Sequence, residues 1–253
     1  MVDYELRGRV ALLTINRPEA RNAVNGAVAN GIEEAIDRLE ADDDVWVGII
    51  TGAGSVFSAG ADLKAISSGD AAGLQTKRGG FGGIARRERT KPMIAAVNGP
   101  AYAGGCEIVL ACDLVVASTE AKFGIPEVKR SLVAAAGGLF RLPRALPKNV
   151  AMELALTGDP IDAQRAYDLG LVNRVCAPEA LIDTAVALAE QITANAPLAV
   201  RASRDILLRG MLADDDTAWR ITNEAFAAVA ASEDFAEGPL AFIEKRAPAW
   251  KGR

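Results

Sequence analysis

Strand-like and helix-like segments alternate along the first two-thirds of the chain. Short apolar runs with the length and β-branched content of buried strands occur at residues 10–15, 46–51, 93–97 and 114–117. Helical patterns lie between them, beginning with an amphipathic segment at residues 26–39. A chain in which strands and helices alternate in this way is expected to fold into an α/β core with parallel strands. In such cores, ligands usually bind at the carboxyl ends of the strands.

The last third of the chain is almost entirely helical in pattern. Helices are predicted over residues 149–156, 163–169 and 180–194, and a further helical segment carrying Trp219 and Phe226 on apolar faces follows Pro197. Pro197 separates two helical patterns, so we expect a boundary between two regions of the chain near Asn195. Residues 1–195 would form the core, and residues 196–253 a C-terminal region for packing or assembly.

The overall composition excludes several classes of function. The chain has 253 residues, is half hydrophobic and carries a net charge of −5 with no broad basic tract, which argues against a nucleic-acid partner. The first residues lack the features of a signal peptide, and no apolar run is long enough to span a bilayer, so we expect a cytoplasmic protein without a membrane partner. The chain contains no histidine, which removes Ser-His-Asp catalysis and imidazole zinc sites.

A carboxylate lies in a segment that otherwise has the pattern of protein interior. Glu107 follows Gly104 and Gly105 and opens the apolar run at residues 108–112, where burying a charge costs several kcal/mol unless something satisfies or uses it. The pattern predicts a glycine turn that feeds a helix, with unpaired N–H groups beside an acid that could hold an oxyanion and move a proton. A capping acid favoured by the helix dipole is the simpler alternative. A second small-residue turn at residues 58–62 and a further acid, Glu127, favour a shared site.

Two other features of the sequence have simple interpretations. The glycine cluster at residues 78–83 lacks the spacing of a phosphate-binding loop, so we predict a mobile surface loop, with a flexible lid beside the site as the alternative. Asp113 and Asp159 are interpreted as turn or capping acids.

Taken together, these motifs resemble the enoyl-CoA hydratase/isomerase, or crotonase, family over nearly the whole chain. The resemblance is carried, in order, by residues 16–18 and 21–23, 57–64, 97–101, 104–107, 123–127, 156–159 and 242–246. It implies a crotonase-like spiral of ββα units followed by a C-terminal helical trimerisation region, assembled as a homo-trimer or as a hexamer built from two trimers.

The resemblance also implies roles for individual residues. The backbone N–H groups of Ala61 and Gly104 would form an oxyanion hole for an acyl-CoA thioester. Glu107 would be the base that activates water for attack at the β carbon, and Glu127 the acid that protonates the α carbon. No metal or redox cofactor would be needed, because coenzyme A is part of the substrate.

Further positions would bind the coenzyme A part of the substrate. They are Arg21, Ala23, Ala59, Asp62, Leu63 and Lys64 from the same subunit, with Phe242 and Lys245 reaching over from a neighbour. A solvated helix charge at Lys64, and a C-terminal helix with one core aromatic and one surface cation at Phe242 and Lys245, are the simpler alternatives.

The predicted activity is the addition of water across the double bond of a 2-enoyl-CoA. Alternatives are a double-bond isomerase, a dehydratase of a specialised acyl-CoA, or a non-catalytic acyl-CoA- or RNA-binding protein on the same scaffold. Ala135 stands where hydratases of the family usually have a glycine in the loop that positions the water, and its methyl group is expected to narrow the site.

Overall fold

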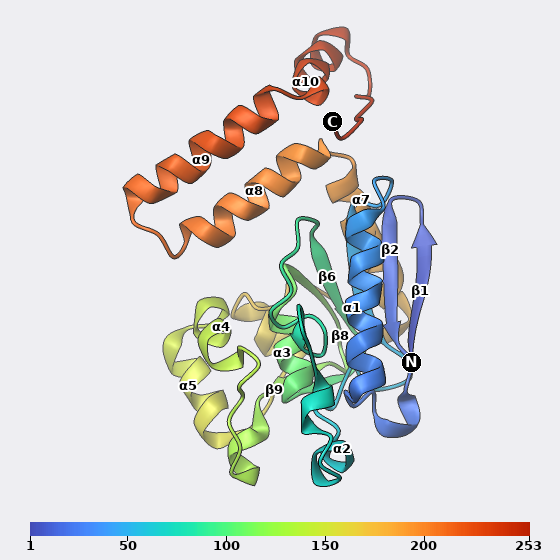
Figure 1. Cartoon of the computed structure of the whole chain (residues 1–253), viewed down its shortest axis with the longest axis vertical. Helices are drawn as coiled ribbons and strands as arrows, with labels where there is room; N and C mark the ends of the chain where they lie inside the picture. The colour runs from blue at the N-terminus through green and yellow to red at the C-terminus, as the bar shows by residue number, and fades with distance from the viewer.

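A six-stranded sheet forms the centre of the protein in the computed structural model, which describes residues 1–253 (Figure 1). Its strands, in spatial order, are β1 (Val2–Arg7), β2 (Val10–Ile15), β3 (Val47–Gly52), β6 (Met93–Val97), β8 (Leu114–Ser118) and β11 (Arg174–Cys176). All neighbours from β2 to β11 pair in parallel, so the predicted parallel α/β core is confirmed. Strand β1 was not predicted; it is a largely exposed edge strand that pairs antiparallel with β2.

Helices cover the two faces of this sheet because side chains alternate along each strand. Leu13 and Ile15 of β2 pack in one cluster with α1 (Gly26–Ala41), whereas Val10 and Leu12 pack in another with α7 (Leu181–Thr193). The other helices of the core are α2 (Leu63–Ser67), α3 (Gly104–Leu110), α4 (Gly138–Ala145), α5 (Lys148–Thr157) and α6 (Ala163–Asp168). The helices predicted in the core at residues 26–39, 149–156, 163–169 and 180–194 are confirmed to within two residues at each end.

A second, three-stranded sheet positions the candidate site. It consists of β7 (Pro100–Tyr102), β9 (Lys122–Gly124) and β10 (Ile161–Asp162), in the order β10-β9-β7. Because β7 and β9 pair in parallel, the segments that follow them start at the same edge of the sheet. Those segments are α3, which carries Glu107, and the 3₁₀ helix Pro126–Arg130, which carries Glu127.

The prediction of a surface loop at residues 78–83 is wrong. The segment contains β5 (Gly80–Phe81), which forms a hairpin with β4 (Gln75–Thr76), and four of its glycines are buried. A Cβ atom on Gly83 would lie only 2.2 Å from the carbonyl oxygen of Ala29, so glycine allows this backbone to pack directly on α1. Glycine clusters serve close packing as well as mobile loops, and the linear pattern does not separate the two.

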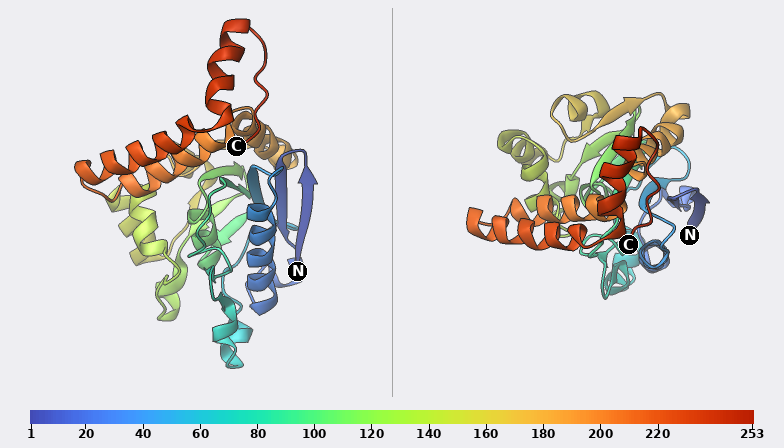
Figure 2. Two further views of the ribbon diagram at one scale, coloured as in Figure 1. Left: turned by 45° about the horizontal axis from the view of Figure 1, so that its top comes forward. Right: turned by 90° about the horizontal axis from the view of Figure 1, so that it is seen from above.

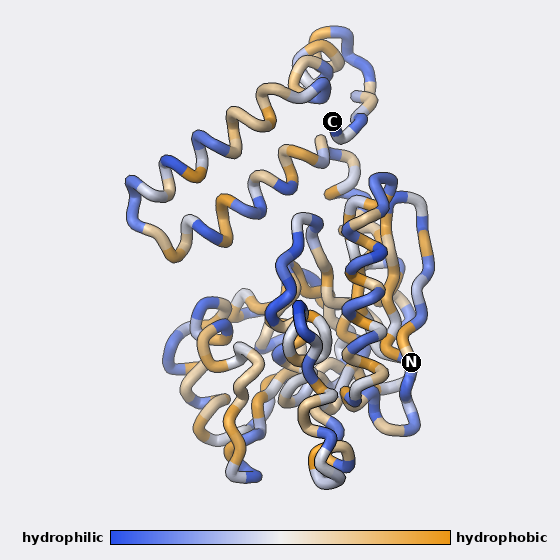
Figure 3. Tube along the Cα trace, viewed as in Figure 1, coloured by the Kyte–Doolittle hydropathy of each residue, from blue (hydrophilic) through white to orange (hydrophobic).

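The C-terminal segment is helical, as predicted, and extends away from the core. It comprises α8 (Pro197–Gly210), α9 (Asp215–Ala230) and α10 (Glu233–Glu244). Figures 1 and 2 show that these helices leave the molecule at the end opposite α2. Apolar positions recur along α8 and α9 (Figure 3), and Trp219 and Phe226 are 66% and 61% exposed. The boundary near Asn195 stays a prediction. None of the helices has the length and apolar character needed to cross a membrane.

Candidate active site

A cavity of about 1230 Å³ lies at the edge where β7 and β9 end. Its walls come from four separate stretches of the sequence: residues 17–23, 59–86, 102–107 and 126–141. Every site residue predicted in the core lines this cavity: Arg21, Ala23, Ala59, Ala61, Asp62, Leu63, Lys64, Gly104, Glu107 and Glu127. Phe242 and Lys245 do not line it, because α10 lies at the far end of the same chain.

Glu107 is buried, with 3% of its surface exposed, and stands in the first turn of α3. Its Oε1 accepts a hydrogen bond of 2.8 Å from the backbone N–H of Gly138, at the start of α4. Burial raises the pKa of this carboxyl, while the backbone N–H groups of Gly138 and Ala136 and the charge of Arg141 act in the opposite direction. Glu107 is therefore buried, as the sequence predicts, and its carboxyl contacts the start of α4.

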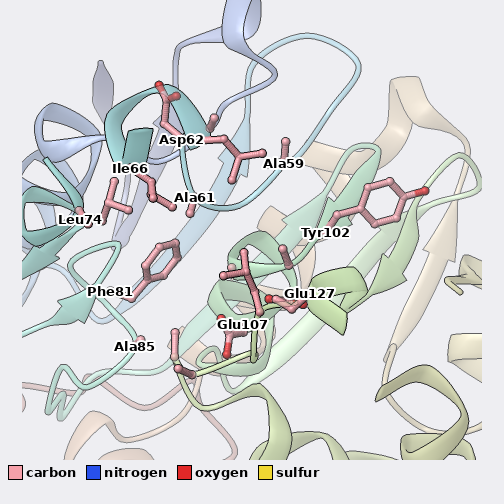
Figure 4. Close-up of a pocket in the computed structure, with 18 of the residues that line it drawn as sticks. Ala59, Ala61, Asp62, Ile66, Leu74, Phe81, Ala85, Tyr102, Glu107 and Glu127 are labelled. Carbon is pink, nitrogen blue, oxygen red and sulfur yellow. The ribbon is translucent and has the colours of Figure 1, made fainter. Parts of the chain in front are cut away.

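Glu127 lies beside Glu107 at the same end of the cavity (Figure 4). Its Oε2 is shielded from solvent and has no hydrogen-bond partner in the protein. Burial raises the pKa of Glu127 to about 7; its own backbone N–H lowers it, and the negative charge of Glu107 raises it further. The site therefore places two carboxyl groups together and keeps both from ionising as readily as they would in water.

Two backbone N–H groups are left free beside the glutamates. The N–H groups of Ala61 and Gly104 donate to no other group of the protein. Their turns touch, since a Cβ atom on Gly60 would lie 2.7 Å from the nitrogen of Gly104. Only glycine fits at position 60, where φ is +86° as well. Unpaired donors at one end of a cavity can bind an oxyanion.

The segments at residues 21–24 and 59–62 run together along another wall of the cavity. The N–H of Ala59 donates to the carbonyl of Arg21 at 3.0 Å, and the N–H of Val24 donates to the carbonyl of Gly60 at 2.8 Å. Asp62 caps α2 by accepting from the N–H of Lys64 at 2.9 Å. The segments are thus held in a fixed register, with Lys64 exposed at the mouth.

Asp62 also pairs with Arg17 across a distance of 2.6 Å. The hydrogen bond from this guanidinium is the main cause that lowers the pKa of Asp62. Asp62 was predicted only as a substrate-binding residue, and the structure gives it a role in tying α2 to residues 17–23.

Phe81 and Arg141 also line the cavity, and neither was predicted from the sequence. Phe81 lies in the glycine cluster that was interpreted as a surface loop, where a lone aromatic among glycines was the available signal. Arg141 of α4 donates to the carbonyls of Ala136 at 3.2 Å and Ala85 at 2.6 Å, and so holds the loop before α4 against the core. Ala135 of that loop lines the cavity, as the sequence predicted.

No group of three or more acidic, cysteine or histidine side chains in the chain is arranged to hold a metal ion. The cavity contains the two acids and the two free backbone donors, and its lining includes both apolar side chains and several arginine and lysine side chains.

Comparisons with known proteins place the chain in a family. A profile of the enoyl-CoA hydratase/isomerase family matches residues 5–253. The chain is 40% identical to carnitinyl-CoA dehydratase of Proteus mirabilis, over 98% of this chain and 97% of that relative. It is 41% identical to short-chain-enoyl-CoA hydratase of Clostridium acetobutylicum, over 97% of this chain and 95% of that relative.

Solved structures agree with this placement. The crystal structure of enoyl-CoA hydratase from Mycobacterium tuberculosis H37Rv superposes with a TM-score of 0.96 at 48% identity, and covers 100% of this chain and 99% of that chain. The chain therefore belongs to the enoyl-CoA hydratase/isomerase family of enzymes, and its fold is the crotonase fold expected from the sequence.

Proposed function

We propose that the protein adds water across the 2,3 double bond of a 2-enoyl-CoA to give a 3-hydroxyacyl-CoA. The observation that carries this proposal is the pair Glu107 and Glu127, which lie together in the cavity with raised pKa values beside two free backbone donors. Addition of water needs one group to take a proton and another to supply one, and a pair of acids of which one is ionised and the other protonated would meet that need.

The proposed reaction assigns each group one task. The thioester oxygen accepts hydrogen bonds from the N–H groups of Ala61 and Gly104, which stabilise the negative charge that develops on it. Glu107, as the carboxylate, takes a proton from water while the water oxygen bonds to the β carbon. Glu127, as the acid, gives its proton to the α carbon, so the substrate gains the elements of water. Glu107 then releases the proton that it took from water and Glu127 takes one up from solvent, which restores both groups for the next turnover.

Dehydration of a 3-hydroxyacyl-CoA is the second candidate. It is the same reaction run backwards through the same groups, and a relative 40% identical to this chain is named carnitinyl-CoA dehydratase. Isomerisation of the double bond is less well supported, because one acid can suffice for moving a proton. A silent binding protein would need neither acid.

We further propose that the coenzyme A part of the substrate lies along residues 21–23 and 59–64, and that the reaction uses no metal or redox cofactor. Proton transfer and backbone hydrogen bonds account for every bond change, so treatment with a chelator should leave turnover unchanged.

A homo-trimer or a hexamer is proposed for the assembly. The C-terminal helices expose large apolar side chains, among them Met211, Trp219 and Phe242, which are 65%, 66% and 85% exposed. Exposed apolar surface of this extent favours burial against another subunit. In such an assembly Phe242 and Lys245 would reach the cavity of a neighbour, which fits their distance from the cavity of their own chain.

The test follows the loss of the conjugated enoyl-thioester absorbance with crotonyl-CoA and a longer 2-enoyl-CoA. Wild-type protein should remove the absorbance, and Glu107→Gln and Glu127→Gln should each lower turnover by about 10²-fold or more while still binding the ester. Retention of near-normal turnover by either variant would contradict the role given to that residue. Binding without loss of absorbance in the wild type would point to isomerase chemistry or to a silent protein.

A further inference from the structure

Each of the two free donors follows a residue with a left-handed backbone. Gly60, with φ +86°, precedes Ala61, and Ala103, with φ 51° and ψ −128°, precedes Gly104. Glycine adopts such angles without strain, whereas an alanine in this region is strained by its Cβ atom. Strain of this kind persists only where the surroundings enforce it.

The surroundings of Ala103 hold its backbone from two directions. Its N–H donates to the carbonyl of Gly124 in β9 at 2.9 Å, and its carbonyl accepts from the N–H of Glu107 at 3.1 Å. The preceding residue, Tyr102, donates to the carbonyl of Ser58 at 3.0 Å. The peptide that carries the N–H of Gly104 is thus fixed between β9 and α3.

The methyl group of Ala103 lies against the turn that carries the other donor. A Cβ atom built on Gly60 would lie 2.9 Å from the Cβ of Ala103. The methyl group of Ala103 therefore occupies the space beside Gly60 that a side chain at position 60 would need. It also restricts rotation of the peptide between Ala103 and Gly104, because a residue with a Cβ atom has fewer accessible backbone angles than glycine.

We propose that Ala103 is a positioning residue, whose strained backbone and methyl group fix the direction of the Gly104 N–H relative to that of Ala61. The proposal rests on the proposed function, in which these donors bind the thioester oxygen. Glycine at position 103 would relieve the strain but would leave the donor peptide free to turn.

The test compares Ala103→Gly with Ser131→Gly, a control at another non-glycine residue with positive φ (54°) that is exposed and does not line the cavity. Both variants should raise Tm by about 2–4 °C through relief of strain. Only Ala103→Gly should lower kcat, by about 10-fold with less than about a 2-fold change in KM, since complete loss of an oxyanion donor costs about 10²–10³-fold.

A second readout does not depend on hydration. Acetoacetyl-CoA forms an enolate that absorbs in the near ultraviolet. When acetoacetyl-CoA is bound, N–H groups of the protein that stabilise the oxyanion increase the fraction present as enolate. Ala103→Gly should lower this absorbance at fixed pH, and Ser131→Gly should not. Unchanged kcat and enolate absorbance in Ala103→Gly, or a lower Tm together with lower kcat, would overturn the proposal. A wild type that stabilises the enolate but hydrates no enoyl-CoA would refute the proposed function alone.

Discussion

Replacing Glu127 with glutamine should stabilise the folded protein at alkaline pH while it removes turnover. The pKa of Glu127 is raised from 4.5 to about 7 in the folded state, mainly by burial. Between these values the folded protein binds more protons than the unfolded chain, so stability falls as pH rises. The loss of folding stability caused by ionising buried Glu127 is absent below the pKa of the unfolded chain and is fully present above about pH 7. A glutamine side chain has nearly the shape of glutamate but no charge, so Glu127→Gln avoids this loss of stability.

The size of the effect follows from the same difference. One pKa unit corresponds to about 1.4 kcal/mol, so the full difference would be roughly 3 kcal/mol. Because the carboxyl is only partly buried, solvent screening reduces the expected gain to about 1–2 kcal/mol. For a chain of this length that gain raises Tm by about 2–8 °C.

The assay is thermal unfolding of wild type and Glu127→Gln at two pH values. At about pH 5 the conditions are near the pKa of Glu127 in the unfolded chain, and at about pH 8.5 they are above its pKa in the folded protein. The gain in Tm should be present at the higher pH and small at the lower one. Glu34→Gln, at an exposed position on α1, is the control for loss of a surface carboxylate and should show no such pH dependence. A Glu127→Gln protein that is equally or less stable than wild type at pH 8.5 would refute the reasoning.

The remaining predictions concern pH, substrate binding and assembly. Hydration should slow as pH rises through about 7, because Glu127 then loses the proton that it must donate, and kcat measured from pH 5.5 to 9 with crotonyl-CoA checks this. Arg17→Ala should raise KM several-fold with a smaller change in kcat, because Asp62 and α2 lose the ion pair that holds them to residues 17–23; an unchanged KM would count against this. Trp219→Ser should weaken the assembly, seen as a lower mass in light scattering, whereas a mass equal to that of wild type would place Trp219 outside any interface.

The fold of the main sheet could be predicted because its strands and helices have clear periods. Runs such as residues 93–97 are wholly apolar, as buried parallel strands are, and α1 has one apolar face. The second sheet could not be predicted in this way. Its strands β7, β9 and β10 contain two or three residues each, too few for any period, and they are fixed by pairing with segments far away in the sequence.

In the candidate site, too, some residues could be predicted from the sequence and others could not. Glu107 stood out because an acid in an apolar run requires an explanation, and Ala61 and Gly104 followed from small-residue turns and from family resemblance. Arg141 gave no such signal, and the lone aromatic Phe81 among glycines gave only a weak one, because both residues line the cavity only once the chain has folded.

The features on which the proposed reaction depends are also the ones expected to cost stability, and they are concentrated at the edge where β7 and β9 end. Glu107 and Glu127 both have raised pKa values, and Ala103 has a strained backbone. Each follows one of the two short strands, whose parallel pairing fixes the backbone on which the strain and the buried acids depend. Substitutions that relax any one of the three should therefore stabilise the fold and slow the reaction together, whereas substitutions that stabilise the protein elsewhere should leave turnover unchanged.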